Sequence, residues 1–147
     1  MYQNILVPTD GSELAGRAIE TAIGLARKLD ARVTGVYAVP EYIPPVDAMV
    51  PVYQFPSKEE YERQAAVEAE VVFKSFSEAC TKAGVPFDLV HGINSHPYQL
   101  ILATAAERGC DLICMSSHGR RGISALILGS ETQKVLTHGE VPVLVVR

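Results

Sequence analysis

Several features that mark membrane, secreted and nucleic-acid-coating proteins are missing from this sequence. No apolar run approaches the roughly 20 residues that a membrane-spanning helix needs. The opening MYQNILVPTDGS lacks the basic start and small-residue cleavage site of a signal peptide. Lysine and arginine form no block longer than Arg120–Arg121, and the net charge is −4. We therefore expect neither a membrane anchor nor a nucleic-acid partner.

Cysteine is scarce, and its spacing suits neither disulfides nor metals. The three cysteines are an odd count with no CxxC pair: Cys80, Cys110 and Cys114. The last two flank one predicted strand, where a separation of four residues spans about 13 Å, too far for a disulfide. The histidines are scattered and show no zinc-ligand spacing. We expect reduced core thiols in a cytoplasmic protein, with no directly bound metal.

The length and composition fit one folded domain, which we place over 1–147. A chain of 147 residues can bury a sizeable core without disulfides. Hydrophobic residues make up 48% of it and charged residues 20%, close to the averages for soluble globular domains. This composition excludes wholesale disorder.

Short apolar strands alternate with amphipathic helices along the chain. The pattern predicts strands over 4–7, 32–39, 87–91, 111–116 and 141–146. It predicts helices over 14–29, 58–83, 97–108 and 130–137, the first two capped by Ser12 and Ser57. Several strands are apolar throughout, which is typical of a parallel sheet covered on both faces. Right-handed crossovers then give a doubly wound α/β sheet, which binds ligands beyond the carboxyl ends of its strands.

The connection Pro40–Pro56 stands apart because it holds five of the nine prolines. Proline removes a backbone donor and disfavours helix for its predecessor, so this segment is neither a helix nor a central strand. Connections of this length are unusual in a compact domain. They serve as lids or binding loops, or they are disordered.

The strand-end rule selects three candidate ligand-binding segments: Pro8–Thr9–Asp10, Val39–Pro40 and Ser116–Ser130. In the last, Gly119 and Gly129 leave backbone amides unshielded, and Gly129–Ser130 opens a helix whose positive end suits an anion. A helical turn is also conceivable at 125–128.

Neighbouring side chains strengthen this candidate phosphate cradle. Thr132 adds a hydroxyl to that of Ser130, and Arg120 adds positive charge. The alternative is that the glycines serve only turns and a helix start. The sequence contains no GxxxxGK[ST], and no GxGxxG follows the first strand, which argues against a Walker-type NTPase or a Rossmann dehydrogenase.

Two enzyme chemistries can be weighed from the residues. A hydrolase would need an acid to orient Ser116, Ser117 and His118, and no GxSxG motif is present; because triads are spatial, the sequence leaves this open. Asp10 is the only acid in a strand-end segment. It can orient a ribose hydroxyl or hold Mg²⁺ with phosphates, or it can simply bond local N–H groups in a turn.

The chain resembles the universal stress protein family over its whole length. The resemblance rests on the opening ILVPTDGS, on Ser117-His118-Gly119 followed nine residues later by Gly129-Ser130, and on the closing VPVLVV. It implies a five-stranded parallel sheet in the order 3-2-1-4-5 and a homodimer. In that order 141–146 is an apolar edge strand, so we expect the dimer to form through it. The resemblance also implies an adenine nucleotide bound through the pattern G-x2-G-x9-G-[ST].

Carried over by position, the second and third glycines of that pattern are Gly119 and Gly129, and the hydroxyl partner is Ser130. Ser116 replaces the first glycine; it can still offer a backbone N–H, or it can crowd a phosphate. The resemblance further implies that Asp10 lies by the ribose and phosphates and that the backbone of Val39 reads the adenine edge. It completes the expected binding residues as follows: Pro8, Thr9, Asp10, Val39, Met115, Ser116, Gly119, Arg120, Gly129, Ser130, Glu131 and Thr132.

The resulting interpretation is a cytoplasmic stress-response protein that binds ATP, ADP or AMP, with Mg²⁺ held through the phosphates and Asp10. It would act as a sensor or regulator of an unidentified protein partner. No residue is arranged as an obvious catalytic base, so any ATP hydrolysis would be slow. Two alternatives stay open: a dimeric interaction module that binds no nucleotide, and a weak Mg-dependent ATPase or phosphotransferase that uses Asp10.

Overall fold

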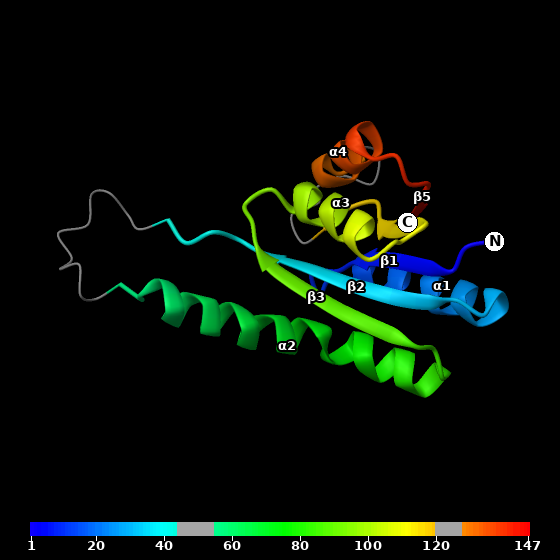
Figure 1. The fold of residues 1–147 in the computed structure, drawn as a ribbon, viewed down its shortest axis with the longest axis horizontal. Coiled ribbons are helices and arrows are strands. Elements are labelled where there is room, and N and C mark those ends of the chain that lie inside the picture. The colour runs from blue at the N-terminus through cyan, green and yellow to red at the C-terminus, as the bar shows by residue number, and fades with distance from the viewer. Residues whose placement is uncertain (44–54, 120–127) are drawn as a thin grey trace.

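The computed structural model describes residues 1–43, 55–119 and 128–147. Strands and helices alternate along these residues, as Figure 1 shows. The strands are β1 (Asn4–Pro8), β2 (Arg32–Val39), β3 (Phe87–Ile93), β4 (Leu112–Ser116) and β5 (Val143–Val146). The helices are α1 (Glu13–Leu29), α2 (Lys58–Ala83), α3 (Pro97–Glu107) and α4 (Ser130–His138).

The described strands form one parallel sheet in the order β3-β2-β1-β4-β5. This confirms the predicted fold class and strand order. β1 lies at the centre, with Ile5 beside Val33 of β2 and also beside Leu112 of β4. The strand order reverses between β1 and β4, which is where a doubly wound sheet opens a crevice for ligands.

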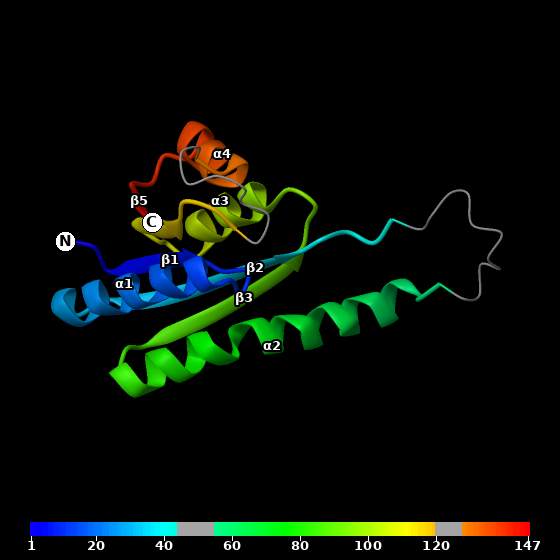
Figure 2. The same cartoon turned by 180° about the vertical axis from the view of Figure 1, so that it is seen from behind.

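Two helices cover each face of the sheet. α1 and α2 lie on one face, whereas α3 and α4 lie side by side on the other (Figures 1 and 2). Successive side chains of a strand point to opposite faces, so Ile5 and Val7 pack with α1 and α2 while Leu6 packs with α3 and α4. Apolar side chains cover both faces of the central strands, which explains why these strands are hydrophobic throughout.

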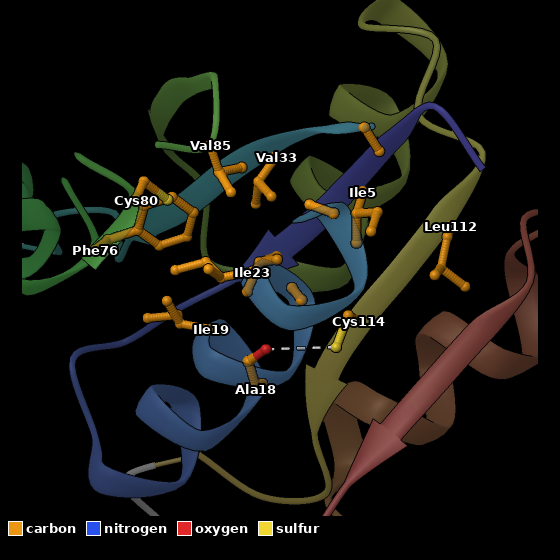
Figure 3. Packing of buried hydrophobic residues seen from close by; sticks show 14 residues of the cluster. Ile5, Ala18, Ile19, Ile23, Val33, Phe76, Cys80, Val85, Leu112 and Cys114 are labelled. Carbon is orange, nitrogen blue, oxygen red and sulfur yellow. Dashed lines mark hydrogen bonds between the residues drawn. The ribbon is translucent and has the colours of Figure 1, made fainter. Parts of the chain in front are cut away.

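The core beneath α1 and α2 is close-packed around Phe76 and Ile5, as Figure 3 shows. The Cys114 thiol lies in it and donates a hydrogen bond of 3.5 Å to the carbonyl of Ala18. All three cysteines are free and buried, as predicted. Burial raises the pKa of Cys80 and of Cys114 to about 11, so both thiols stay protonated at neutral pH.

Both predicted helix caps are confirmed. The Ser12 hydroxyl accepts from the N–H of Ala15, and the Ser57 hydroxyl accepts from the N–H of Glu60. Each bond satisfies one of the N–H groups that the first turn of a helix leaves without a partner. Gly84 ends α2 with a φ of 68°, a backbone conformation that glycine adopts without strain.

The strand boundaries differ from the prediction by two residues at two places and by one residue at the end of β1 and the start of β4. β3 continues to Ile93, two residues past the predicted end, because it stays paired with β2 as far as Val39. β5 begins at Val143 rather than at 141, because Pro142 has no N–H to donate; its carbonyl nonetheless accepts from Ile113. The helical turn considered at 125–128 falls largely outside the described residues.

A polar anchor fixes β1 against β4 at their amino ends. The Asp111 carboxylate accepts from the backbone N–H groups of Gln3 and Asn4, at 2.8 and 3.1 Å. The buried Asn4 side chain donates to the carbonyl of Arg108 and accepts from the Thr34 hydroxyl. These bonds hold the register of β1, and so they also determine where the chain leaves the other end of that strand.

Two glycines give opposite expectations for stability. A Cβ on Gly35 of β2 would lie 3.0 Å from both Leu89 and Phe76, whereas one on Gly24 of α1 would meet no atom within 4 Å. We expect Gly35→Ala to lower the free energy of unfolding by about 1–3 kcal/mol through overpacking. Gly24→Ala should raise it by about 0.5–1 kcal/mol, because alanine favours helix. Urea unfolding followed by circular dichroism measures both, and a shift of the same sign in the two variants would contradict the packing described.

Candidate functional site

Two loops meet at the carboxyl edge of the sheet, one after β1 and one after β4. Asp10 lies in the first and Gly119 in the second. A Cβ built on Gly119 would lie 2.7 Å from Oδ2 of Asp10. The two segments that the sequence selected are therefore in contact, at the point where the strand order reverses.

The loop after β1 is a tight turn built on its own side chains. Oδ1 of Asp10 accepts from the N–H of Ser12 at 2.9 Å, and the Thr9 hydroxyl accepts from the N–H of Gly11 at 3.2 Å. Gly11 has a φ of 76°, which favours glycine. Asp10 thus does bond local N–H groups, and the turn aims its second carboxylate oxygen at the glycine loop.

Where the chain leaves β4, the carbonyls of residues 116–118 are bound by the protein. The Thr132 hydroxyl donates to the carbonyl of Ser116 at 3.1 Å and approaches that of Ser117 at 3.4 Å. The N–H of Gly129 also donates to the carbonyl of Ser117, at 2.8 Å. The Ser116 hydroxyl donates to the carbonyl of His118 at 2.8 Å. Three consecutive carbonyl oxygens are therefore occupied.

In contrast to these carbonyls, several backbone N–H groups of the same region lack a partner among the described residues. Within the described part of the chain, the N–H groups of Gly119, Ser130 and Glu131 donate to nothing. Two of them belong to the first turn of α4, where a helix leaves its N–H groups unpaired and its dipole is positive. Among the described residues here, the carbonyls of 116–118 are occupied while these three donors are left over, which is the polarity that an anion requires.

Gly129 is required for a different reason from the one the sequence suggested. Its φ of −59° is ordinary, but a Cβ there would lie 2.8 Å from the carbonyl oxygen of Ser117 and 3.3 Å from Cα of His118. The first effect of a side chain at 129 would be to push the loop away from α4. Ser130, which is exposed, is the better position at which to probe a ligand.

Ser116, the departure from the glycine pattern, is well accommodated. It is buried at the end of β4, and its hydroxyl bonds within the loop to the His118 carbonyl rather than standing unpaired. The Ser117 hydroxyl oxygen lies 3.1 Å from Nδ1 of the His118 ring, within hydrogen-bonding distance. The serine hydroxyls of this turn thus hold its shape.

The other predicted binding residues lie at the ends of β1, β2 and β4, apart from Arg120. Pro8 and Thr9 lie at the end of β1, beside the crevice. Met115 and Val39 have buried side chains, so only their backbone can face a ligand; the Val39 carbonyl already accepts from the N–H of Asn94 at 2.8 Å. Arg120 lies outside the described residues.

Sequence reasoning missed what the Glu131 and Thr132 side chains do. Thr132 is buried and holds the loop carbonyls, which the hydroxyl pattern alone did not distinguish from a ligand contact. The Glu131 carboxylate points to α3, where Oε2 accepts from the N–H of Tyr98 at 2.9 Å. Only the packing of α3 beside α4 reveals that contact.

Two kinds of feature are absent from the described residues. These residues contain no group of three or more histidine, cysteine, aspartate or glutamate side chains that could hold a metal ion. Nor does any helix among them have the length and apolar character needed to cross a membrane.

Comparison with known proteins identifies the relatives of this chain. The model of the universal stress protein family matches residues 1–147. A protein of Thermus aquaticus, named as a universal stress protein in the QAH/OAS sulfhydrylase 3′ region, is 33% identical over 150 residues, which cover all of both chains. The solved structure of hypothetical protein MJ0577 is 28% identical, with a TM-score of 0.80 over 99% of this chain and 96% of that one.

More distant structures share the fold with a nucleotide present. A universal stress protein in complex with cAMP is 22% identical, with a TM-score of 0.70 over 99% of this chain and 97% of that one. Family proteins from Archaeoglobus fulgidus in complex with dAMP and from Arabidopsis thaliana with AMP bound have TM-scores of 0.61 and 0.66.

The loop after β4 should depend on one hydroxyl. Thr132→Val keeps the shape of the side chain but leaves the carbonyls of Ser116 and Ser117 short of a donor. We expect it to lower the free energy of unfolding by about 1–2 kcal/mol. Thr137→Val is the matched control, because that hydroxyl bonds the Gln133 carbonyl on the exposed face of the same helix, and it should change stability by less than about 0.5 kcal/mol. Thermal unfolding of both variants measures the difference; equal effects would show that the buried bonds contribute nothing.

Proposed function

Because this chain belongs to the universal stress protein family, we propose that it is a cytoplasmic stress-response protein that binds an adenine nucleotide as a sensor or regulator. The phosphates would lie at the start of α4, against the N–H groups of Gly119, Ser130 and Glu131. The ribose and base would extend across Asp10 toward the end of β2.

The polarity of the loop after β4 carries this proposal. A glycine turn that served only to connect two elements would leave both donors and acceptors to water. Here Thr132, Ser116 and the Gly129 amide occupy the carbonyls of residues 116–118, while Gly119 and the start of α4 leave N–H donors without partners among the described residues. Phosphate oxygens are pure acceptors, and they match such a set.

Similar structures support adenine as the base. The ligands in three of them, cAMP, dAMP and AMP, share an adenine ring and a phosphate on the sugar. In this chain, Val39 at the end of β2 can present only its backbone groups, since its side chain is buried. Backbone groups suit the edge of a purine, which carries both donors and acceptors.

Asp10 gives a physical reason to expect Mg²⁺ with a polyphosphate. Its carboxylate lies beside the glycine loop, so a phosphate chain there would meet a negative charge. Magnesium prefers oxygen ligands and commonly bridges a carboxylate and substrate phosphates. We therefore expect Mg²⁺ to matter more for ATP than for AMP.

Ser130 allows the phosphate assignment to be tested without disturbing the loop. Ser130→Asp adds a negative charge at the start of α4, which stabilises the helix but repels a phosphate. We expect the affinity for ATP with Mg²⁺ to fall at least about tenfold, the loss of one charge-assisted hydrogen bond, while the melting temperature holds or rises. Ser130→Asn, nearly isosteric and neutral, should change the affinity much less.

Titration calorimetry on the wild type and both variants measures these affinities. Equal affinity in Ser130→Asp and Ser130→Asn would place the phosphates elsewhere. A wild type that binds no adenine nucleotide would favour the alternative of an interaction module.

We also propose a homodimer through β5, which is an edge strand with apolar side chains. The carbonyls of Pro142 and Val146 accept from β4. Since backbone groups alternate along a strand, those of Val143 and Val145 point to the open edge, where an antiparallel partner could pair. Such a contact would be isologous.

Val145→Pro removes one outward N–H while leaving the bonds to β4 in place. If two edges pair, this variant should be monomeric in sedimentation at micromolar concentration, because proline cannot donate to a ladder. Val145→Thr, which keeps the N–H and the β-branched shape, should stay dimeric. A Val145→Pro variant that is as dimeric as the wild type, with its circular dichroism unchanged, would rule out pairing through this edge.

A further inference from the structure

The Glu131 carboxylate turns away from the helix that carries it. Glu131 is the second residue of α4, yet its Oε2 accepts from the N–H of Tyr98, the second residue of α3, at 2.9 Å. The residue that would normally cap α3, His96, makes no side-chain cap bond. Glu131 therefore supplies an acceptor for the first turn of α3 and ties the amino ends of the two helices together.

A lysine on the same helix balances this charge. The Lys134 ammonium lies 2.8 Å from Oε1 of Glu131 and 5.5 Å from the centroid of the Tyr98 ring. The hydrogen bond and charge of Glu131 raise the pKa of Lys134, so the lysine stays protonated well above neutral pH. The Glu131–Lys134 pair thus has a net charge close to zero.

Because the Glu131–Lys134 pair lies at the start of α4, it can affect the electric field that a bound ligand meets. A carboxylate in the first turn of a helix is attracted to the unpaired N–H groups of its own helix. In α4 those N–H groups include Ser130 and Glu131, where the phosphates are proposed to lie. The bond to Tyr98 holds the carboxylate away from them, and Lys134 offsets its field.

We propose that the Glu131–Lys134 pair sets how strongly this site discriminates among adenine ligands by their phosphate charge. This rests on the proposed function. The side chains of Glu131 and Lys134 determine specificity through the field at the start of α4 rather than by touching the ligand.

The test compares the affinities for adenosine, AMP and ATP, measured by calorimetry at low ionic strength with Mg²⁺ held constant. Glu131→Gln keeps an acceptor for Tyr98 but leaves Lys134 uncompensated, so the ratio of ATP to adenosine affinity should rise about two- to fivefold. Lys134→Met leaves Glu131 uncompensated and should lower that ratio by a similar factor. The double variant should restore the wild-type ratio, and adenosine affinity should stay constant throughout.

Hydrogen exchange of the Tyr98 amide tests the tether without any nucleotide. Exchange should be about tenfold faster in Glu131→Ala, which loses the acceptor, than in Glu131→Gln, which keeps it. Glu140→Gln makes the same change of charge beyond the far end of α4 and should alter neither the exchange nor the ratio.

Three results would overturn the inference. A ratio that does not change in either single variant would show that the pair has no influence on the site. A parallel loss of all three ligands would show a merely structural role. Equal exchange of Tyr98 in Glu131→Ala and Glu131→Gln would remove the tether. If the wild type bound none of the ligands, the proposed function would fail together with the selectivity, whereas the exchange result would still report on the tether.

Discussion

The proposed site depends on the parallel pairing of β1 with β4. Asp111 accepts from the first N–H groups of β1, and this anchor sets the register of the two strands. At their other ends, the same register brings the Asp10 turn against Gly119. The helices that follow these strands, α1 and α4, cover opposite faces, so neither of them crosses the space between the two loops. The position of the site is thus determined by the strand order, and the side chains then determine what it can bind.

The hydrogen bonds beside these two loops give the site a preference for a negatively charged ligand. Buried backbone groups need partners, and Thr132, Ser116 and the Gly129 amide supply them to the carbonyls of residues 116–118. Among the described residues beside these carbonyls, the N–H groups without a partner belong to Gly119 and to the first turn of α4. The substitution of serine for glycine at 116 fits this scheme, because its hydroxyl serves an acceptor and leaves the donors open. Binding and stability therefore share the same loop.

Sequence patterns predicted the elements whose causes are local. Ser12 and Ser57 cap their helices through neighbouring N–H groups, and the apolar runs identify the buried strands. Patterns selected Gly129 but did not reveal its tightest contact, which is with the Ser117 carbonyl 12 residues earlier in the chain. They missed the Glu131 contact with Tyr98 altogether. Such contacts arise only when two distant segments pack, and no spacing in the chain encodes them.

The central claim is that an adenine nucleotide places its phosphate on the N–H groups at the start of α4. Amide chemical shifts of isotope-labelled protein, followed during a titration with AMP and then with ATP and Mg²⁺, test it residue by residue. We expect the largest changes in chemical shift at the amides of Gly119, Ser130 and Glu131, and larger changes with ATP than with AMP. Saturable binding whose shifts leave these three amides unmoved would contradict it.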